Sequence, residues 1–225
     1  MTNFIPDNTL SSSKPYHHGD LRRQLLDAAA SIIRDEGEAA LSMRKLAQEV
    51  GVSRTAPYHH FSDKQALLCA VAEEGFRRFR VQVSFGPQAY SGGETNAALS
   101  PVLDEETIRN FIRNYIDFAV NNAEYYRLMF GGHLWKSQQL TASLKDEAHA
   151  SFKLYVDQVR AWQQFAAKET AVDALRYAQV SWSTLHGMSC LLIDGIYLDS
   201  AAVAAMTDTA ARMFWQQLRG SESSG

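Results

Sequence analysis

Apolar residues recur every three or four positions along most of the chain, which is the period of an amphipathic α-helix. These stripes cover residues 21–33, 43–50, 67–79, 108–119, 144–162, 175–189 and 203–218. No stretch of the sequence shows the sustained alternation of apolar and polar residues that marks a half-buried β-strand. The pattern therefore predicts an all-α fold.

Two stretches lack this periodicity and divide the chain. Residues 1–15 are polar, with three consecutive serines and two prolines, and are expected to form a flexible tail. Residues 84–101 hold three glycines and two prolines, which is typical of a loop. We therefore expect a first helical domain over 16–80, including a connecting helix, and a larger helical domain over 100–220.

The segment SMRKLAQEVGVSRTAPYHHF, which begins at Ser42, has the pattern of two short helices joined by a tight turn. Ser42 can cap the first helix, and Gly51 can end it by adopting a left-handed backbone conformation. Ala47 is small enough for a second helix to cross closely, and Ser53 can open that second helix. The segment therefore predicts a helix-turn-helix, whose second helix enters the major groove of DNA in proteins of this kind.

Pro57 lies inside the predicted second helix, which would otherwise run from Ser53 towards Phe61. A proline there removes a backbone hydrogen bond and disfavours helix at the preceding residue. We therefore expect a short helix, held partly by packing of Tyr58 and Phe61. The next helix is expected to open at Ser62, in a capping box with the glutamine three residues later.

The second helix is the element expected to read the base sequence, through the exposed residues Arg54, Thr55, Tyr58 and His59. Arg54 can form paired hydrogen bonds with guanine, and Thr55 can donate to a base or contact a thymine methyl group. In the first helix, Ser42 lies at an N-terminus that suits a phosphate, and Arg44 can reach a phosphate or a base edge.

The charge balance supports this interpretation only mildly. The formal net charge is −3, which argues against a generally basic coat that would bind nucleic acid. Residues 14–64 hold 8 Lys and Arg against 7 Asp and Glu, a net of +1. Affinity for DNA is therefore expected to depend on where a few cations are placed.

The stretch 19–80 resembles the DNA-binding domain of the TetR/AcrR family of transcriptional regulators, through AAASIIRDEG and LSMRKLAQEVGVSRTAPYHHFSDKQALL. The resemblance implies a homodimer on a palindromic double-stranded DNA operator, usually a repressor that a small-molecule effector releases. It also implies that Tyr58, His60 and Lys64 occupy phosphate-contacting positions.

Near the C-terminus, Trp182-Ser-Thr-Leu-His186-Gly187 resembles the Trp-x-x-x-His-Gly type of C-terminal domain. This resemblance implies a homodimer formed through the last two helices, and an apolar effector cavity between helices. Most aromatic residues of this half are expected to form the core. The candidate effector-binding residues are Phe111, Tyr115, Tyr126, Met129, Phe130, His133, Trp135, Trp182 and His186.

The main alternative is a helical metal sensor or metalloenzyme that uses the histidines. Two Tyr-His-His triplets hold four of the seven histidines, and His186, Cys190 and Asp194 fall on one face of a helix. We prefer a packing role for that face, because no second Cys/His pair supports a metal site. A DNA-bound regulator without a small ligand is a further alternative.

Other patterns narrow the functional class. The sequence has no Gly-rich phosphate loop and no nucleophile elbow, so we expect no enzyme activity, no cofactor and no metal. It has no signal peptide and no apolar run long enough to span a membrane, and its two cysteines are far apart. These features favour a cytoplasmic protein.

Overall fold

The computed structural model describes residues 18–83, 104–137, 139–165, 172–197 and 199–219, and every regular element within these ranges is helical. The all-α prediction is therefore confirmed. The predicted tail over 1–15 and the predicted loop over 84–101 lie outside the described residues. None of the described helices is long and apolar enough to cross a membrane.

In chain order the elements are α1 (His18–Glu36), the 3-10 turn η1 (Glu38–Ala40), α2 (Met43–Val50), the 3-10 turn η2 (Ala56–His59), α3 (Lys64–Gln82), α4 (Glu105–Asn121), α5 (Ala123–Phe130), α6 (Gly132–Trp135), α7 (Ala142–Phe165), α8 (Ala174–Ile193) and α9 (Ser200–Arg219).

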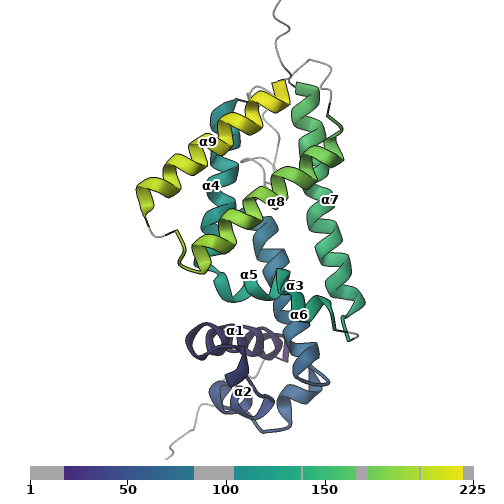
Figure 1. Ribbon diagram of the computed structural model, residues 1–225. Helices are drawn as coiled ribbons and strands as arrows, with labels where there is room; N and C mark the ends of the chain where they lie inside the picture. The colour runs from purple at the N-terminus through teal and green to yellow at the C-terminus, as the bar shows by residue number, and fades with distance from the viewer. Residues whose placement is uncertain (1–17, 84–103, 138, 166–171, 198, 220–225) are drawn as a thin grey trace, which may run out of the picture.

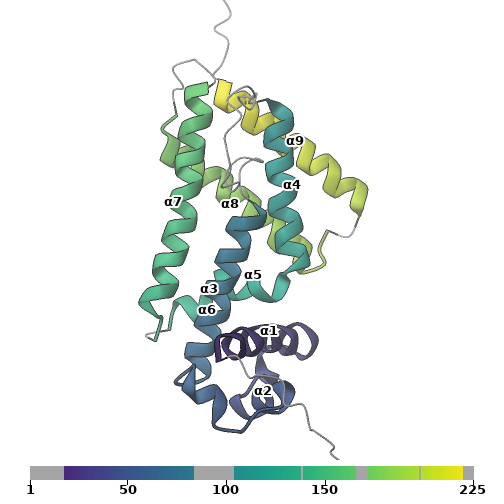
Figure 2. The ribbon, with the colours of Figure 1, turned by 180° about the vertical axis from the view of Figure 1, so that it is seen from behind.

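These elements form two bodies (Figure 1). A smaller one holds α1, α2 and the lower end of α3, and the upper end of α3 continues into a larger one built from α4 to α9. The reverse view shows that α8 and α9 lie on one face of the larger body, with α3 and α7 on the other (Figure 2). One helix, α3, is therefore common to both bodies.

The first half of the helix-turn-helix follows the sequence prediction. Ser42 caps α2, because its hydroxyl accepts a hydrogen bond from the backbone N–H of Lys45 at 3.2 Å. Gly51 ends the helix at φ 74°, a left-handed conformation that glycine adopts without steric cost. Ala47 is buried, and its carbonyl accepts from Val52 N at 2.9 Å, which closes the turn.

The predicted second helix from Ser53 is wrong, because the segment folds only into the single 3-10 turn η2. The hydroxyl of Ser53 lies 3.2 Å from the hydroxyl of Thr55 and does not cap a helix. The buried Pro57 has no N–H to donate and disfavours helix before it, so no α-helical ladder forms. Phe61 is buried as expected, whereas Tyr58 is 55% exposed, so the expected packing of Tyr58 is also wrong.

The start of α3 differs from the predicted capping box at Ser62. The N-cap is Asp63, whose carboxylate accepts from Ala66 N at 2.8 Å, and Ser62 instead donates to that carboxylate at 3.3 Å. Asp caps a helix as well as Ser does, and its charge favours a helix N-terminus. The helix therefore begins one residue later than a Ser62 cap would set.

Two short helices, α5 and α6, follow α4 and were not predicted from the sequence. They are short enough that no long apolar stripe marks them. The crossing of α3 and α5 is tight at Gly75, where an added Cβ would lie 2.8 Å from Met129 Sδ and 3.2 Å from Tyr125 Cβ. A glycine at this point therefore lets α5 lie close against α3.

The core of the larger body is aromatic. The ring of Phe79 lies 5.1 Å from Tyr115, 5.3 Å from Phe118 and 5.6 Å from Trp182, centroid to centroid. Edge-to-face pairs of this kind stabilise a core beyond the area that they bury. The upper end of α3 is therefore held by rings from α4 and α8.

Candidate nucleic-acid interface and effector cavity

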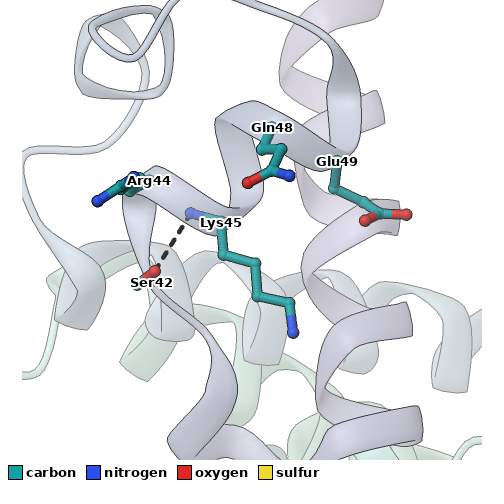
Figure 3. A pocket seen from close by; sticks show the side chains of 5 residues that line it. All are labelled: Ser42, Arg44, Lys45, Gln48 and Glu49. Carbon is teal, nitrogen blue, oxygen red and sulfur yellow. Dashed lines mark hydrogen bonds between the residues drawn. The ribbon is translucent and has the colours of Figure 1, made fainter.

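The exposed face of α2 carries the first group of predicted DNA contacts. Ser42, Arg44 and Lys45 line a shallow hollow of about 320 Å³ together with Gln48 and Glu49 (Figure 3). Arg44 points away from Lys45, whose ammonium group contacts Glu36. Arg44 has no acidic partner among the described residues, so its guanidinium is available to an external anion.

The second group lies on η2 and the turn before it. Arg54, Thr55, Tyr58 and His59 are all exposed, as expected from the sequence, and His60 is half-buried. In the described part of the chain, Arg54 forms no ion pair. These side chains therefore present one cation, two hydroxyl groups and one imidazole at the surface that follows the turn.

Lys64 lies at the start of α3, and its ammonium group already has one hydrogen-bond partner within the protein. Its ammonium group donates to the backbone carbonyl of Glu38 at 2.9 Å, which ties α3 to η1. The side chain is half-buried. A phosphate contact by Lys64 would therefore be made from a side chain that is already oriented.

Ion pairs join the smaller body to the larger body. Arg78 of α3 contacts Asp27 of α1 at 2.6 Å and lies over the ring of Tyr125 at 4.7 Å. Arg34 of α1 contacts the buried Glu124 of α5 at 3.5 Å. The position of α1 is thus linked to that of α5.

A further contact of this kind involves α6. His133 Nε2 lies 3.4 Å from a carboxylate oxygen of Glu38 in η1, and the His133 side chain is 62% exposed. The next residues of α6 turn inward, because Leu134 is buried and Trp135 is partly buried. One short helix therefore touches both bodies.

A solvent-open cavity of about 370 Å³ lies between five helices of the larger body. Its lining is apolar and consists of Phe76 from α3, Phe130 from α5, Trp135 from α6, Ala148 and Phe152 from α7, and Trp182 from α8. The indole N–H of Trp135 donates to the backbone carbonyl of Met129 at 2.6 Å. No charged side chain belongs to this lining.

A row of polar side chains lies behind Phe130. The hydroxyls of Tyr115 and Tyr126 are 3.0 Å apart, and the Tyr126 hydroxyl is 2.8 Å from His186 Nδ1. His186 Nε2 lies 3.5 Å from Cys190 Sγ. Burial raises the pKa of both tyrosines and lowers the pKa of His186, so the hydroxyls stay protonated and the neutral imidazole is favoured.

Two family profiles match this chain. Residues 25–71 match the profile of bacterial regulatory proteins of the tetR family, and residues 108–214 match a tetracyclin repressor-like C-terminal domain. The chain belongs to the TetR family. The N-terminal match of this TetR-family chain covers its helix-turn-helix, and the C-terminal match covers α5 to α8, which surround the cavity together with α3.

Two curated relatives match part of the chain. An HTH-type transcriptional repressor of Mycobacterium tuberculosis is 40% identical over 68 residues, which is 30% of this chain and 36% of that protein. The HTH-type transcriptional activator FasR of Mycolicibacterium smegmatis is 30% identical over 124 residues, which is 55% of this chain and 52% of FasR. The match thus spans about half the length of these relatives or less.

Among solved structures, a protein of unknown function from Rhodococcus sp. RHA1 is 35% identical, with a TM-score of 0.71. That similarity covers 90% of this chain and 97% of the other. The fatty acid degradation regulator FadR of Bacillus halodurans shares the fold, with 15% identity and a TM-score of 0.65 over 92% of this chain and 100% of that chain.

The structure distributes the predicted effector residues of this TetR-family chain over several environments. Phe130, Trp135 and Trp182 line the cavity, and Tyr115, Tyr126 and His186 lie in the polar row behind it. The others lie elsewhere: Phe111 and Met129 are core residues, and His133 is exposed and turned towards Glu38. The cavity residues Phe76, Ala148 and Phe152 were not predicted, because they lie on ordinary helical stripes of the sequence.

The metal alternative finds little support in this TetR-family structure. Asp194 pairs with Arg127 at 3.1 Å, and His186 bonds to Tyr126, so the predicted face of His186, Cys190 and Asp194 is used for internal contacts. Within the described residues, no group of three or more His, Cys, Asp or Glu side chains is placed to hold a metal ion.

Proposed function

We propose that this protein is a homodimeric, sequence-specific regulator of transcription that binds a palindromic operator in the bacterial cytoplasm. The observation that carries the proposal is the exposed set Arg54, Thr55, Tyr58 and His59 directly after a well-formed helix and turn, in a chain of the TetR family. Both relatives are named as transcriptional regulators, which supports a regulatory rather than a catalytic role.

The dimer is proposed to form through α8 and α9. These helices lie on one face of the larger body and expose large apolar side chains, Val180 at 67% and Met213 at 61%. Burial of such side chains against a second copy would remove apolar surface from water. A two-fold symmetric pair would then read two half-sites separated by about 34–36 Å, one turn of DNA.

Direct binding tests the DNA-contact surface. Binding sites are first selected from random DNA with the full chain, and affinity for the selected site is then measured by fluorescence anisotropy at fixed salt. Arg54→Ala removes a guanine contact worth about 1–3 kcal/mol per half-site and should relax the sequence preference at one position. Arg113→Ala removes the same charge from an exposed position on α4 and serves as the control.

Equal losses in the two variants would show only a general effect of charge and would refute the assignment of Arg54. Failure of the wild-type chain to enrich any site would refute the proposed function itself.

Repression released by a ligand is the mode of action that we propose. The relative with 40% identity is named a repressor, whereas FasR is named an activator. Whether this protein represses or activates transcription is therefore tested separately. A reporter placed behind the selected operator should be expressed more strongly when the gene for this protein is deleted. Weaker expression after deletion would make the protein an activator.

A further inference from the structure

We infer that Arg22 of α1 binds a phosphate of the operator backbone, and that the ring of Phe61 positions the guanidinium group for that contact. The inference rests on the proposed function, because the phosphate belongs to the bound operator. It adds a contact from α1 to the contacts that we propose for α2, η2 and the start of α3. It also gives the buried Phe61 a role in binding in addition to its place in the core.

Arg22 lies on the outer surface of α1, in the smaller body (Figure 1). Its neighbours Leu21 and Leu25 are buried and hold α1 against the rest of that body, whereas Arg22 is exposed. The guanidinium carbon of Arg22 lies 5.4 Å from the centre of the Phe61 ring. Phe61 directly follows His60, which is the C-cap residue of η2. The contact therefore places a cation of α1 beside the end of η2.

The contact with Phe61 orients the guanidinium group but leaves its hydrogen-bonding capacity unused. Phe61 is only 4% exposed, so packing fixes its ring and makes it a rigid support. A cation–π contact at this distance attracts the charge of the arginine without providing a hydrogen-bond acceptor for its N–H donors. Arg22 forms no ion pair and donates to no oxygen in the part of the chain that the structure describes. Its donors are therefore open to an external acceptor.

The surroundings of Arg22 favour a DNA phosphate as that acceptor. The ring of His60 lies 6.3 Å from the ring of Phe61, so a second residue with a proposed phosphate contact lies beside the same support. The acidic residue closest to Phe61 in sequence is Asp63, whose carboxylate is held by the N–H of Ala66 at 2.8 Å. A phosphate offers a negative charge and paired oxygens that match the fork of a guanidinium group. An exposed surface next to η2 suits the continuous backbone of a duplex.

Arg23, the next residue of α1, differs from Arg22 in each of these respects. Its side chain is 80% exposed, and its Nε lies 3.8 Å from a carboxylate oxygen of Asp27. It contacts no aromatic ring among the described residues. Asp27 also binds Arg78 at 2.6 Å, so the loss of Arg23 leaves that carboxylate paired. Arg23→Ala therefore removes the same charge from the same turn of α1, and it is the matched control.

The salt dependence of operator binding tests the contact. The full chain is titrated against the selected operator by fluorescence anisotropy at several NaCl concentrations. Each phosphate contact adds about 0.9 to the slope of log affinity against log salt concentration, because it releases bound counterions. Since a dimer would make the contact twice, Arg22→Ala should reduce the slope by about 1.8. It should also lower the affinity at least about tenfold. Arg23→Ala should change the slope by less than about half as much.

Sequence preference separates Arg22 from Arg54, because a phosphate contact carries no base information. Arg22→Ala should bind the selected operator and a scrambled duplex of the same composition more weakly by similar factors. Arg54→Ala should instead relax the preference for the operator. Arg22→Lys keeps the charge but loses the planar fork, so it should keep the wild-type salt slope and still lose affinity.

Methylphosphonate linkages locate the contact on the DNA. Each one replaces a single backbone phosphate of the operator by an uncharged group. At one linkage per half-site, the replacement should weaken binding by the wild type and by Arg23→Ala but leave Arg22→Ala unaffected, because that variant has already lost the contact. The same test with His60→Ala should identify that linkage or its direct neighbour, since both side chains lie beside Phe61.

Phe61→Leu tests the positioning role of the ring. Leucine keeps an apolar side chain in the core but offers no ring to the guanidinium group. The substitution should weaken operator binding by the wild type and have no further effect in Arg22→Ala. A purely structural effect would weaken both chains equally. Circular dichroism checks that each variant is folded at the assay temperature, and Phe61→Met replaces Phe61→Leu if the latter is not.

Equal salt slopes of Arg22→Ala and Arg23→Ala, or a changed sequence preference in Arg22→Ala, would overturn the inference. The same conclusion would follow if every methylphosphonate weakened Arg22→Ala as much as the wild type. Equal effects of Phe61→Leu in the two backgrounds would overturn the positioning role. All of these outcomes involve a wild-type chain that binds its operator. They are therefore distinct from a failure of the wild type to enrich any site, which would refute the proposed function itself.

Discussion

Removal of one hydroxyl at Tyr126 should destabilise the protein more than removal of an equally buried hydroxyl elsewhere. The Tyr126 hydroxyl lies 3.0 Å from the hydroxyl of Tyr115 and 2.8 Å from His186 Nδ1. A consistent arrangement has Tyr115 donating to Tyr126, and Tyr126 donating to the neutral imidazole. In Tyr126→Phe, the fully buried hydroxyl of Tyr115 would have no partner among the described residues.

The expected loss of stability in Tyr126→Phe follows from the Tyr115 hydroxyl that would be left without a partner. A net hydrogen bond contributes about 0.5–1.5 kcal/mol, and a buried polar group without a partner costs about 1–3 kcal/mol. We therefore expect Tyr126→Phe to lower the free energy of unfolding by about 2–3 kcal/mol per protomer.

Tyr155→Phe is the matched control. The Tyr155 hydroxyl is 2.7 Å from Ser181 Oγ, and Ser181 Oγ also donates to the carbonyl of Tyr177 at 2.7 Å, so Ser181 keeps a partner when the hydroxyl is lost. The expected loss is therefore only about 1 kcal/mol. Tyr126 and Tyr155 are both 1% exposed, so burial does not distinguish them.

The assay is urea unfolding followed by circular dichroism at pH 7.5. Wild type and both variants are compared at one protein concentration, because the stability of a dimer depends on concentration. A loss in Tyr126→Phe that is no greater than the loss in Tyr155→Phe, with equal m-values, would refute the reasoning about the polar row.

Two further predictions concern the turn η2, which we propose reads DNA, and the partly buried His186. Pro57→Ala should change the free energy of unfolding by only about 1 kcal/mol but should shift the affinity for the operator, because η2 gains a backbone N–H donor and can extend into a helix. An anisotropy titration that gives the same affinity as the wild type would count against this prediction. Burial lowers the pKa of His186 in the folded protein below its value of 6.5 in the unfolded chain. As the pH falls below 6.5, the unfolded chain therefore binds a proton at His186 more readily than the folded protein does, and the free energy of unfolding decreases. Urea unfolding at pH 7.5 and 5.5 should therefore show a smaller acid loss in His186→Asn than in wild type, and parallel losses would contradict the assignment.

The sequence predicted the long helices well because their apolar stripes and their ends are local features. The α2 helix follows this rule, since Ser42 and Gly51 lie in the positions that their side chains and backbone favour. The start of α3 was misplaced because Ser62 and Asp63 are both good caps, and packing decides between them. The α-helix that Ser53 was expected to cap does not form, because Pro57, four residues later, disfavours it.

The cavity could be predicted only in part. Periodicity shows that Phe76, Phe130 and Phe152 face inward, but it does not show which inward side chains leave space between them. The contact between Arg34 and Glu124 joins positions 90 residues apart, and no local pattern indicates it. The candidates Phe130, Trp135 and Trp182 were selected for their chemistry, and three-dimensional packing brought them together.

The close crossing of α3 and α5 at Gly75 divides α3 into two parts of unequal length. The part from Gly75 to Phe79, which the rings of the core hold, is about 6 Å long, and the part from Gly75 to Lys64 is about 16 Å long, at 1.5 Å per residue. If α3 pivoted at the contact between Gly75 and Met129, a movement of about 0.5 Å at Phe79 would produce a movement of more than about 1 Å at Lys64. A hydrogen bond tolerates only about 0.5 Å, so a sub-ångström change in the core would be enough to alter the phosphate contact that we propose for Lys64.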